Sequence, residues 1–253
     1  MSLLEYVKVG GIKTACLSRQ GLVRAIATEI ETHKSQTLPK LLFDANGHAL
    51  ALAIMDRSYL EDMNKADIIH ADGQPLVIAS RLLTKSPIPE RSATTDLFHD
   101  VARSAAADGV KFFLLGGTEE VNKACAEKMQ QMYPSLDIAG RRNGYFTPDD
   151  EAKVCHEINE SGTNVIWVGL GKPLEQAFCV RNRDRLNAAW LITCGGCFNY
   201  VTGAYARAPE WMQKAGLEWV HRLLPEPRKL GWRYFTTTPL ALILLFARTS
   251  SKV

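Results

Sequence analysis

Short apolar runs alternate along the chain with longer stretches in which apolar residues recur at helical spacing. Buried strands are predicted at residues 41–43, 66–70, 110–115, 165–168 and 191–193, and a helical segment follows each of them. Residues 6–14 predict a short extended segment that turns at Gly10-Gly11, and Ser18 is placed to cap the first helix. Strands and helices that alternate at this spacing predict an α/β fold, with a Rossmann-like parallel sheet flanked by helices on both faces.

The pattern changes near residue 204. From Pro209 onwards it becomes Trp- and Arg-rich and helical, and we expect breaks at Pro225, Pro227 and Pro239. We therefore predict an α/β catalytic core at 1–204 and a basic C-terminal appendage at 205–253. The longest apolar run in the appendage, residues 240–247, is much shorter than the ~20 residues that span a bilayer.

Charge is concentrated in the appendage. The chain as a whole has a net charge of +3, which is too small to indicate nucleic acid as a partner. From Arg207 onwards, however, eight Lys and Arg residues face three Glu residues, a balance that suits an anionic membrane surface or phosphate groups. The six cysteines are scattered and no secretory signal is recognisable, so we expect a reduced, cytoplasmic setting.

Glycine-rich turns follow three of the predicted strands. Ligands of open parallel sheets bind beyond the carboxyl ends of the strands, and glycine lets the backbone approach a diphosphate closely. One such turn is more often only a tight turn, but three together favour a nucleotide or phosphate site. The dinucleotide fingerprint is absent, which argues against a dehydrogenase. The glycines concerned are Gly116, Gly117, Gly169, Gly171, Gly195 and Gly196.

Asp72 stands at the end of a predicted strand and is followed by Gly73. A carboxylate at that place can act as a general base, although a helix cap or a turn aspartate fits the pattern equally well. Asp67, inside the strand pattern, is expected to make a structural bond. Arg91 follows a proline-broken loop, where pattern alone favours an exposed surface arginine, but its planar guanidinium could also pair with a phosphate. Asp96 is expected to cap a helix that begins at Leu97.

A bound metal or other cofactor is not expected. The chain contains no Asp-x-Asp pair, which is the usual metal–diphosphate handle of nucleotide-sugar enzymes, and no His, Asp and Glu cluster at ligand spacing. The Cys194-x-x-Cys197 spacing lacks a second ligand pair, so packing of small residues at a glycine turn explains it better than zinc or redox chemistry.

Taken in order, many short segments resemble the WecG/TagA/CpsF glycosyltransferases (glycosyltransferase family 26) of bacterial surface-polymer synthesis. The resemblance covers residues 7 to 240, nearly the whole chain. It rests on the segments Phe43-Asp44-Ala45-Asn46, 66–73, Arg91 with Asp96-Leu97, 113–117, Gly144-Tyr145-Phe146, 168–173, 207–212, 216–219, Arg222-Leu223 and Glu226-Pro227-Arg228.

The resemblance implies an inverting, metal-independent transfer of a hexosyl residue from a UDP-sugar to a polyprenyl-diphosphate-linked sugar. Asp72 matches the family's proposed base, Arg91 matches an arginine of the family's site, and Tyr145 is expected near the nucleotide. Asp44 is a second carboxylate that could share the acid–base role or bind sugar hydroxyls. The expected substrate-binding set is completed by Asn46, Glu175, Gln176, Asn199, Arg207, Arg222, Arg228 and the six turn glycines.

Three departures from the family pattern fall at expected site positions. Asp44 stands where the family usually has Thr, Glu175-Gln176 stands where it has Gln-Glu, and Asn199 stands where it has Asp. They leave the reaction class intact but leave the donor open. Donors in the family include UDP-N-acetylmannosamine, its uronic acid and, in gum-producing systems, UDP-glucose.

Two further questions stay open at this point. The glycine turns and the basic tail also fit a non-catalytic nucleotide-binding module of a membrane polysaccharide synthase, although Asp72 and Arg91 together favour an enzyme. The appendage, with Trp211, Trp219 and Trp232, is expected to hold the protein peripherally at the inner face of the plasma membrane and to meet the acceptor's diphosphate. Alternatively, it packs only on the core or on another subunit of a homo-oligomer.

Overall fold

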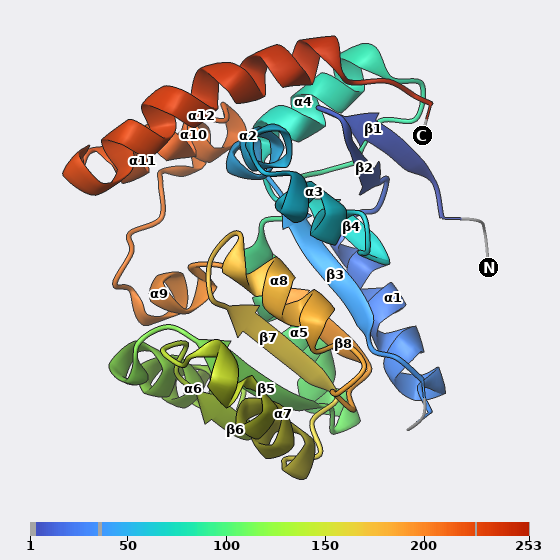
Figure 1. Ribbon diagram of the computed structural model, residues 1–253, viewed down its shortest axis with the longest axis vertical. Helices are drawn as coiled ribbons and strands as arrows, with labels where there is room; N and C mark the ends of the chain where they lie inside the picture. Colours follow the sequence, from blue (N-terminus) through green and yellow to red (C-terminus); the bar gives the residue numbers. More distant parts are fainter. Residues whose placement is uncertain (1–3, 35–36, 226, 253) are drawn as a thin grey trace.

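A six-stranded, fully parallel sheet forms the centre of the molecule (Figure 1). The computed structural model describes residues 4–34, 37–225 and 227–252. The strand order across the sheet is β4-β3-β8-β7-β5-β6. The α/β prediction is therefore confirmed. The strands are β3 (Lys40–Ala45), β4 (Ile68–Ala71), β5 (Lys111–Gly116), β6 (Asp137–Arg142), β7 (Val165–Gly169) and β8 (Trp190–Thr193).

Each face of the sheet is covered by helices that bury their apolar side. Alternate residues of β5 enter the two hydrophobic clusters, with Phe113 in one and Phe112 in the other, so the strand reads as a continuous apolar run. One cluster includes buried residues of α2 (Gly47–Met55), α3 (Arg57–Met63), α4 (Gln74–Leu83), α7 (Glu151–Glu160) and α8 (Leu174–Arg181). The other includes those of α1 (Arg19–Thr32), α5 (Thr94–Asp108), α6 (Glu119–Met132) and α9 (Cys197–Thr202).

The helices that follow β3 and β8 pack on opposite faces, so these neighbouring strands form a topological switch point. Helix α2 follows β3 on one face, and α9 follows β8 on the other. Open α/β sheets bind ligands in the crevice at such a point, beyond the carboxyl ends of the strands. Asp44, next to the last residue of β3, and Thr193, the last residue of β8, meet there.

An antiparallel hairpin of β1 (Tyr6–Val9) and β2 (Ile12–Ala15) lies beside the sheet and turns at Gly10 and Gly11, both at positive φ. The end of the chain returns to this hairpin. Lys8 and Ser250 exchange both backbone hydrogen bonds, with N···O distances of 3.0 and 2.9 Å. The beginning and the end of the described chain are thus joined (Figure 1).

The last part of the chain contains α10 (Glu210–Lys214), α11 (Glu218–Leu223) and α12 (Pro227–Ala247). Pro227 opens α12, but Pro239 lies inside it, so the predicted break at Pro239 is wrong. A proline inside a helix costs ~3 kcal/mol. Burial of Leu230, Ala241, Leu244 and Leu245, with packing on α2 and α4, offsets that cost.

Because α12 continues through Pro239, its apolar part is longer than the run at residues 240–247 that the sequence pattern shows. Residues 230–247 have a mean hydropathy of 1.2, and by length and composition alone they would suffice to cross a membrane. Only 28% of them are buried inside the protein. The helix nevertheless packs along α2 and α4 in the structure (Figure 1).

Two other features differ from the sequence prediction. The edge strand β6 was missed because its residues, DIAGRR, form no apolar run and are only half-buried or exposed. Helix α5 begins at Thr94 rather than at Leu97, so Asp96 lies in its first turn and does not cap it. Another carboxylate takes that role, as described below.

Candidate functional site

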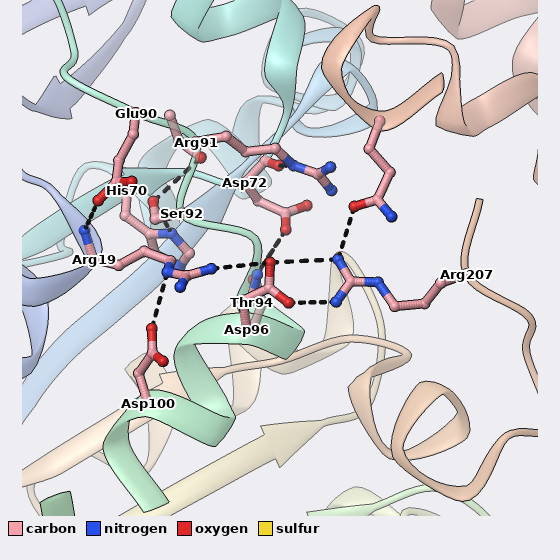
Figure 2. A network of polar contacts seen from close by, with 12 residues as sticks. Arg19, His70, Asp72, Glu90, Arg91, Ser92, Thr94, Asp96, Asp100 and Arg207 are labelled. Carbon is pink, nitrogen blue, oxygen red and sulfur yellow. Dashed lines mark hydrogen bonds and ion pairs between the residues drawn. The ribbon is translucent and has the colours of Figure 1, made fainter. Parts of the chain in front are cut away.

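Asp72 directly follows β4 and lies against the N-terminus of α5, as Figure 2 shows. Its Oδ1 accepts hydrogen bonds from the Thr94 backbone N–H at 2.9 Å and from the Thr94 hydroxyl at 3.3 Å. Its Oδ2 accepts one from Asn46 Nδ2 at 3.1 Å. Helix α5 receives no cap from Ala93, so Asp72 supplies this cap from outside the helix. The helix-cap interpretation of Asp72 is therefore correct, and it does not exclude a role as general base for the same carboxylate.

The environment of Asp72 favours its ionised form. Burial opposes the charge, but the Arg91 guanidinium, the Thr94 N–H and the Asn46 amide outweigh it and hold the pKa of Asp72 below its usual range. His70, in the strand before it, is buried and donates to or accepts from the Ser92 hydroxyl at 2.9 Å, and burial lowers the pKa of His70. At neutral pH the site thus presents a carboxylate able to accept a proton.

Arg91 lies beside Asp72 and is held on two sides. Its Nε donates to the Asp72 carbonyl oxygen at 2.6 Å, and its Nη2 lies 2.5 Å from Glu218 Oε2, on α11. Its side chain is only 16% exposed, so it is not the free surface arginine that sequence pattern alone allows. A planar guanidinium in this place can exchange Glu218 for an anionic group of a ligand.

Asp44 is buried beside a lysine that the sequence analysis did not single out. Lys172 Nζ lies 2.5 Å from Asp44 Oδ2 and 3.5 Å from Glu175 Oε1. Asp44 also accepts from the Thr193 hydroxyl at 3.1 Å, at the switch point between β3 and β8. Asn46 Nδ2 lies 3.4 Å from Asp44 Oδ2, so Asn46 connects Asp44 with Asp72.

Glu175 binds backbone N–H groups that were expected to serve a phosphate. Its Oε2 accepts from Gly171 N at 3.1 Å and from Gly195 N at 2.9 Å. The neighbouring Gln176 is also fully buried, and its Nε2 lies 3.4 Å from Glu175 Oε1. Burial raises the pKa of Glu175 to about 7, against the opposing effect of Lys172.

The remaining turn glycines permit close approach of neighbouring strands. A Cβ on Gly116 would lie 2.2 Å from the Gly169 carbonyl oxygen, and one on Gly169 would lie 3.0 Å from the Gly195 carbonyl oxygen. Gly117 N donates to the Gly169 carbonyl oxygen at 3.3 Å. These glycines hold the carboxyl edge of the sheet together, and Gly196 precedes α9 at the same edge.

Tyr145 is 79% exposed in the loop after β6, at the opposite edge of the sheet from Asp72. Its loop joins the turn after β5 through a 2.9 Å hydrogen bond from Gly144 N to the Gly117 carbonyl oxygen. Asn199, on α9, is half-buried. The Asp72 carboxylate makes its hydrogen bonds with Thr94 and Asn46, so a ligand that touched Asp72, Asn199 and Tyr145 would have to extend along the carboxyl edge of the sheet.

The appendage arginines differ in their surroundings. Arg207 pairs with Asp96 and Gln213 (Figure 2), whereas Arg228 is exposed at the start of α12. Arg222 lies over the rings of Tyr200 and Tyr205, 5.6 and 5.5 Å from their centroids. Only Arg222 among these three is thus held between the appendage and α9 by aromatic rings.

Sequence reasoning missed Lys172, Thr94 and Glu218 as members of the site. Thr94 and Glu218 carry no pattern that separates them from ordinary helix-start residues. Lys172 offered one signal, because a cation between Gly171 and Pro173 at a strand end, near two unusual carboxylates, suggests charge compensation. All three act through contacts that link distant parts of the chain.

Comparison with known proteins identifies the family to which the chain belongs. The model of the glycosyl transferase WecG/TagA/CpsF family matches residues 7–252. A Bacillus subtilis (strain 168) protein named N-acetylglucosaminyldiphosphoundecaprenol N-acetyl-beta-D-mannosaminyltransferase is 31% identical over 79% of this chain and 75% of its own length. A Staphylococcus aureus (strain MRSA252) protein of the same name is 32% identical over 74% of this chain and 72% of its own length. The chain therefore belongs to the WecG/TagA/CpsF family of glycosyl transferases.

Proposed function

We propose that this protein transfers a hexosyl residue, with inversion, from a UDP-sugar to a polyprenyl-diphosphate-linked sugar in the synthesis of a bacterial exopolysaccharide or other surface polymer. Family membership supports the reaction class, and the names of the relatives support a lipid-diphosphate acceptor. The observation that carries the proposal is the ionised, hydrogen-bonded Asp72 at the carboxyl edge of the sheet, next to Arg91.

In the proposed reaction Asp72 is the general base. The acceptor hydroxyl attacks the anomeric carbon, its proton passes to the Asp72 carboxylate, and the bond from the anomeric carbon to the UDP oxygen breaks. Thr94 and Asn46 orient the carboxylate while it accepts the proton. Its pKa is low for a base in the resting site, and diversion of Arg91 to the donor's diphosphate would raise it towards the range useful for catalysis.

Arginine side chains are proposed to stabilise the departing UDP. Arg91 would exchange Glu218 for a phosphate oxygen, since a guanidinium binds two oxygens of a phosphate in one plane. Once the donor is bound, a cation held where negative charge develops lowers the barrier to the departure of UDP. The N–H groups of Gly171 and Gly195 donate to Glu175 here, so we assign the phosphate charge to arginines rather than to these turns.

The appendage is proposed to hold the protein on the inner face of the plasma membrane. Large apolar side chains at helical spacing form one exposed face of α12, which we call the α12 apolar face: Trp232, Phe235, Leu242, Ile243 and Phe246. The opposite side of α12, with Leu230, Ala241, Leu244 and Leu245, is buried against the core. A helix with one side packed on protein and the other apolar suits a position in the lipid interface.

The donor sugar is left as an N-acetylmannosamine-type or glucose residue. The relatives' names specify N-acetylmannosamine for those proteins. In this chain Asp44 stands where the family usually has Thr, and Glu175-Gln176 transposes its usual Gln-Glu, so the site gains one carboxylate, and the buried Lys172 contacts both Asp44 and Glu175. Because of this added carboxylate, glucose stays beside N-acetylmannosamine as a proposed donor residue.

A donor screen tests the proposal directly. The full-length protein would be mixed with each UDP-sugar, with and without a short-chain polyprenyl-diphosphate-linked N-acetylglucosamine, and UDP release and lipid product would be measured. We expect one donor to give product only when the acceptor is present. UDP binding without turnover of any donor would instead support a non-catalytic nucleotide-binding module.

A further inference from the structure

Lys172 lies at the centre of a buried cluster of three charges, the other two being Asp44 and Glu175. The side chains of the three residues are only 7%, 5% and 0% exposed. Charges buried this deeply are tolerated only when they compensate one another. Lys172 is the cation that both carboxylates contact, so its loss would leave two buried carboxylates without a counter-charge.

A single side chain joins this cluster to Asp72. Asn46 Nδ2 reaches Asp44 Oδ2 at 3.4 Å and Asp72 Oδ2 at 3.1 Å, while Asn46 Oδ1 accepts from Ala49 N at the start of α2. The amide is therefore fixed at its oxygen and shared at its nitrogen. A displacement of Asp44 changes how the amide nitrogen is shared, and it thereby changes the hydrogen bond that orients Asp72.

The other side of the cluster fixes the turns at the edge of the sheet. Glu175 Oε2 ties Gly171 N, after β7, to Gly195 N, after β8. Lys172, 3.5 Å from the second oxygen of Glu175, therefore links these turns to β3 through Asp44. Through Asp44 and Glu175, the ammonium group of Lys172 thus links the ends of β3, β8 and β7. Asn46 extends this link to Asp72, which follows β4.

We propose that Lys172 is a positioning residue for Asp72, acting through Asp44 and Asn46. The proposal rests on the proposed function, in which Asp72 accepts the proton of the acceptor. The ammonium group of Lys172, 2.5 Å from Asp44 Oδ2, holds that oxygen in the place from which it contacts the Asn46 amide, and thereby keeps the amide in the orientation that serves Asp72. The long-range charge of Lys172 also favours the ionised form of Asp72, in the same direction as the charge of Arg91.

Burial keeps several histidine, tyrosine and cysteine side chains near the cluster or near Asp72 in their uncharged forms. Burial lowers the pKa of His70 and, to about 4, that of His48, and burial raises the pKa of Tyr200 to about 12. Burial also raises the pKa values of Tyr59, Cys179, Cys194 and Cys197 above their usual range. The charged groups that lower the pKa of Asp72 are Arg91, with the larger effect, and Lys172.

The first test is kinetic and uses the full-length Lys172→Met variant. Loss of orientation at Asp72 is expected to lower kcat by roughly 10- to 100-fold, with a donor KM within about threefold of the original. The acid limb of the pH–rate profile is expected to move to higher pH. The matched control is Arg181→Met, which removes a cation 2.5 Å from the mostly buried Glu151, on α7, away from Asp72. Equal kcat values and equal pH profiles for the two variants would overturn the proposal.

The second test needs no turnover. The carboxyl group of Asp72 would be titrated by carbon-13 NMR without substrates and assigned with Asp72→Asn. If Lys172→Met folds poorly, Lys172→Met/Glu175→Gln leaves one unpaired carboxylate instead of two. We expect Asp72 to titrate at higher pH than in the unaltered protein and in Arg181→Met. An unchanged titration overturns the positioning role. If the titration of Asp72 shifts in Lys172→Met but the unaltered protein transfers no sugar from any donor, the positioning role is supported and the proposed function is rejected.

Discussion

The carboxylate of Asp72 caps α5 through the backbone N–H of Thr94, at 2.9 Å, although the two residues lie on separate elements. The positive end of the helix dipole therefore stabilises the same charge that is proposed to accept a proton. Helix capping needs only an oxygen that accepts a hydrogen bond, whereas general-base catalysis needs a group that accepts a proton. An asparagine at position 72 can provide the first but not the second.

We expect Asp72→Asn to abolish transfer while leaving the fold intact. Loss of a general base lowers kcat by roughly 10²- to 10⁴-fold. The amide oxygen can still accept from Thr94, so stability should fall by only about 1 kcal/mol through loss of charge at the helix N-terminus. Measurements of kcat, UDP affinity and urea unfolding test this expectation.

The matched control is Asp67→Asn, before the same strand. Asp67 accepts from Leu41 N at 2.8 Å and pairs with Arg183 at 2.7 Å, which confirms the expected structural bond. This control should lose stability but keep kcat. Near-normal turnover by Asp72→Asn would move the role of base to Asp44.

Transfer is expected to continue in excess EDTA. In the proposed reaction Arg91, together with Arg222, which lies over the Tyr200 ring, meets the diphosphate charge that a metal ion would otherwise neutralise. Initial rates with and without chelator, at constant ionic strength, provide the measurement. Activity that disappears with EDTA and returns with Mg²⁺ or Mn²⁺ would refute the prediction.

Glu175→Gln should change how stability depends on pH. The pKa of Glu175 is raised from 4.5 to about 7 in the folded protein, so its contribution to stability is complete below about 4.5 and is lost as the pH rises through about 7. The amide can keep accepting from Gly171 and Gly195. At pH 8 the variant should therefore be the more stable protein, by about 1–3 kcal/mol, with a smaller difference at pH 5.

Denaturant unfolding at both pH values measures this difference. If the free energies of unfolding of the two proteins differ by the same amount at pH 5 and at pH 8, Glu175 does not titrate in this range. The donor KM of the variant, measured over the same UDP-sugars, separately tests whether position 175 influences donor choice. An unchanged KM for each donor would show that it does not.

The α12 apolar face should bind anionic vesicles. Replacement of both Trp232 and Phe235, each 77% exposed, by Ser should weaken binding by roughly 10²- to 10⁴-fold, because transfer of each side chain from water into the lipid contributes about 1.5–3 kcal/mol. Sedimentation with vesicles tests this. The control is Met132→Ser, on α6 at the far end of the molecule from α12 (Figure 1).

Truncation after Ala204 would be a poorer test of the same idea. It removes α12 and thereby exposes the sides of α2 and α4 on which that helix packs. Loss of vesicle binding would then be mixed with aggregation. If the double serine variant binds vesicles as the unaltered protein does, the membrane role of this face is refuted.

Glu218→Gln should tighten the binding of UDP by roughly three- to tenfold. Glu218 holds Arg91 at 2.5 Å and competes with a phosphate for the same guanidinium, so its neutralisation raises the fraction of free Arg91. Calorimetric titration with UDP provides the measurement, with Glu210→Gln, on exposed α10, as control. Weaker binding would mean that Glu218 orients Arg91 for the donor.

Local pattern was enough to predict the parallel sheet and the position of Asp72. Apolar runs such as residues 110–115 are buried on both faces, and a carboxylate after a strand must lie at the carboxyl edge. Three features depend on contacts distant in sequence and could not be predicted in this way. Within the described residues the polar edge strand β6 pairs only with β5, Pro239 is tolerated because α12 packs on α2 and α4, and Arg91 is held by Glu218.

The backbone pairing of Lys8 with Ser250 fixes the far end of α12 to the hairpin. Gly10 N also donates to Thr249 Oγ1, a contact across 239 positions of sequence. Helix α12 is therefore held along its length by α2 and α4 and, directly after its last residue, by the hairpin. A helix fixed in this way cannot turn about its own axis without breaking these contacts. A lipid surface that bound the α12 apolar face would therefore meet the whole sheet, and Asp72 with it, in one orientation.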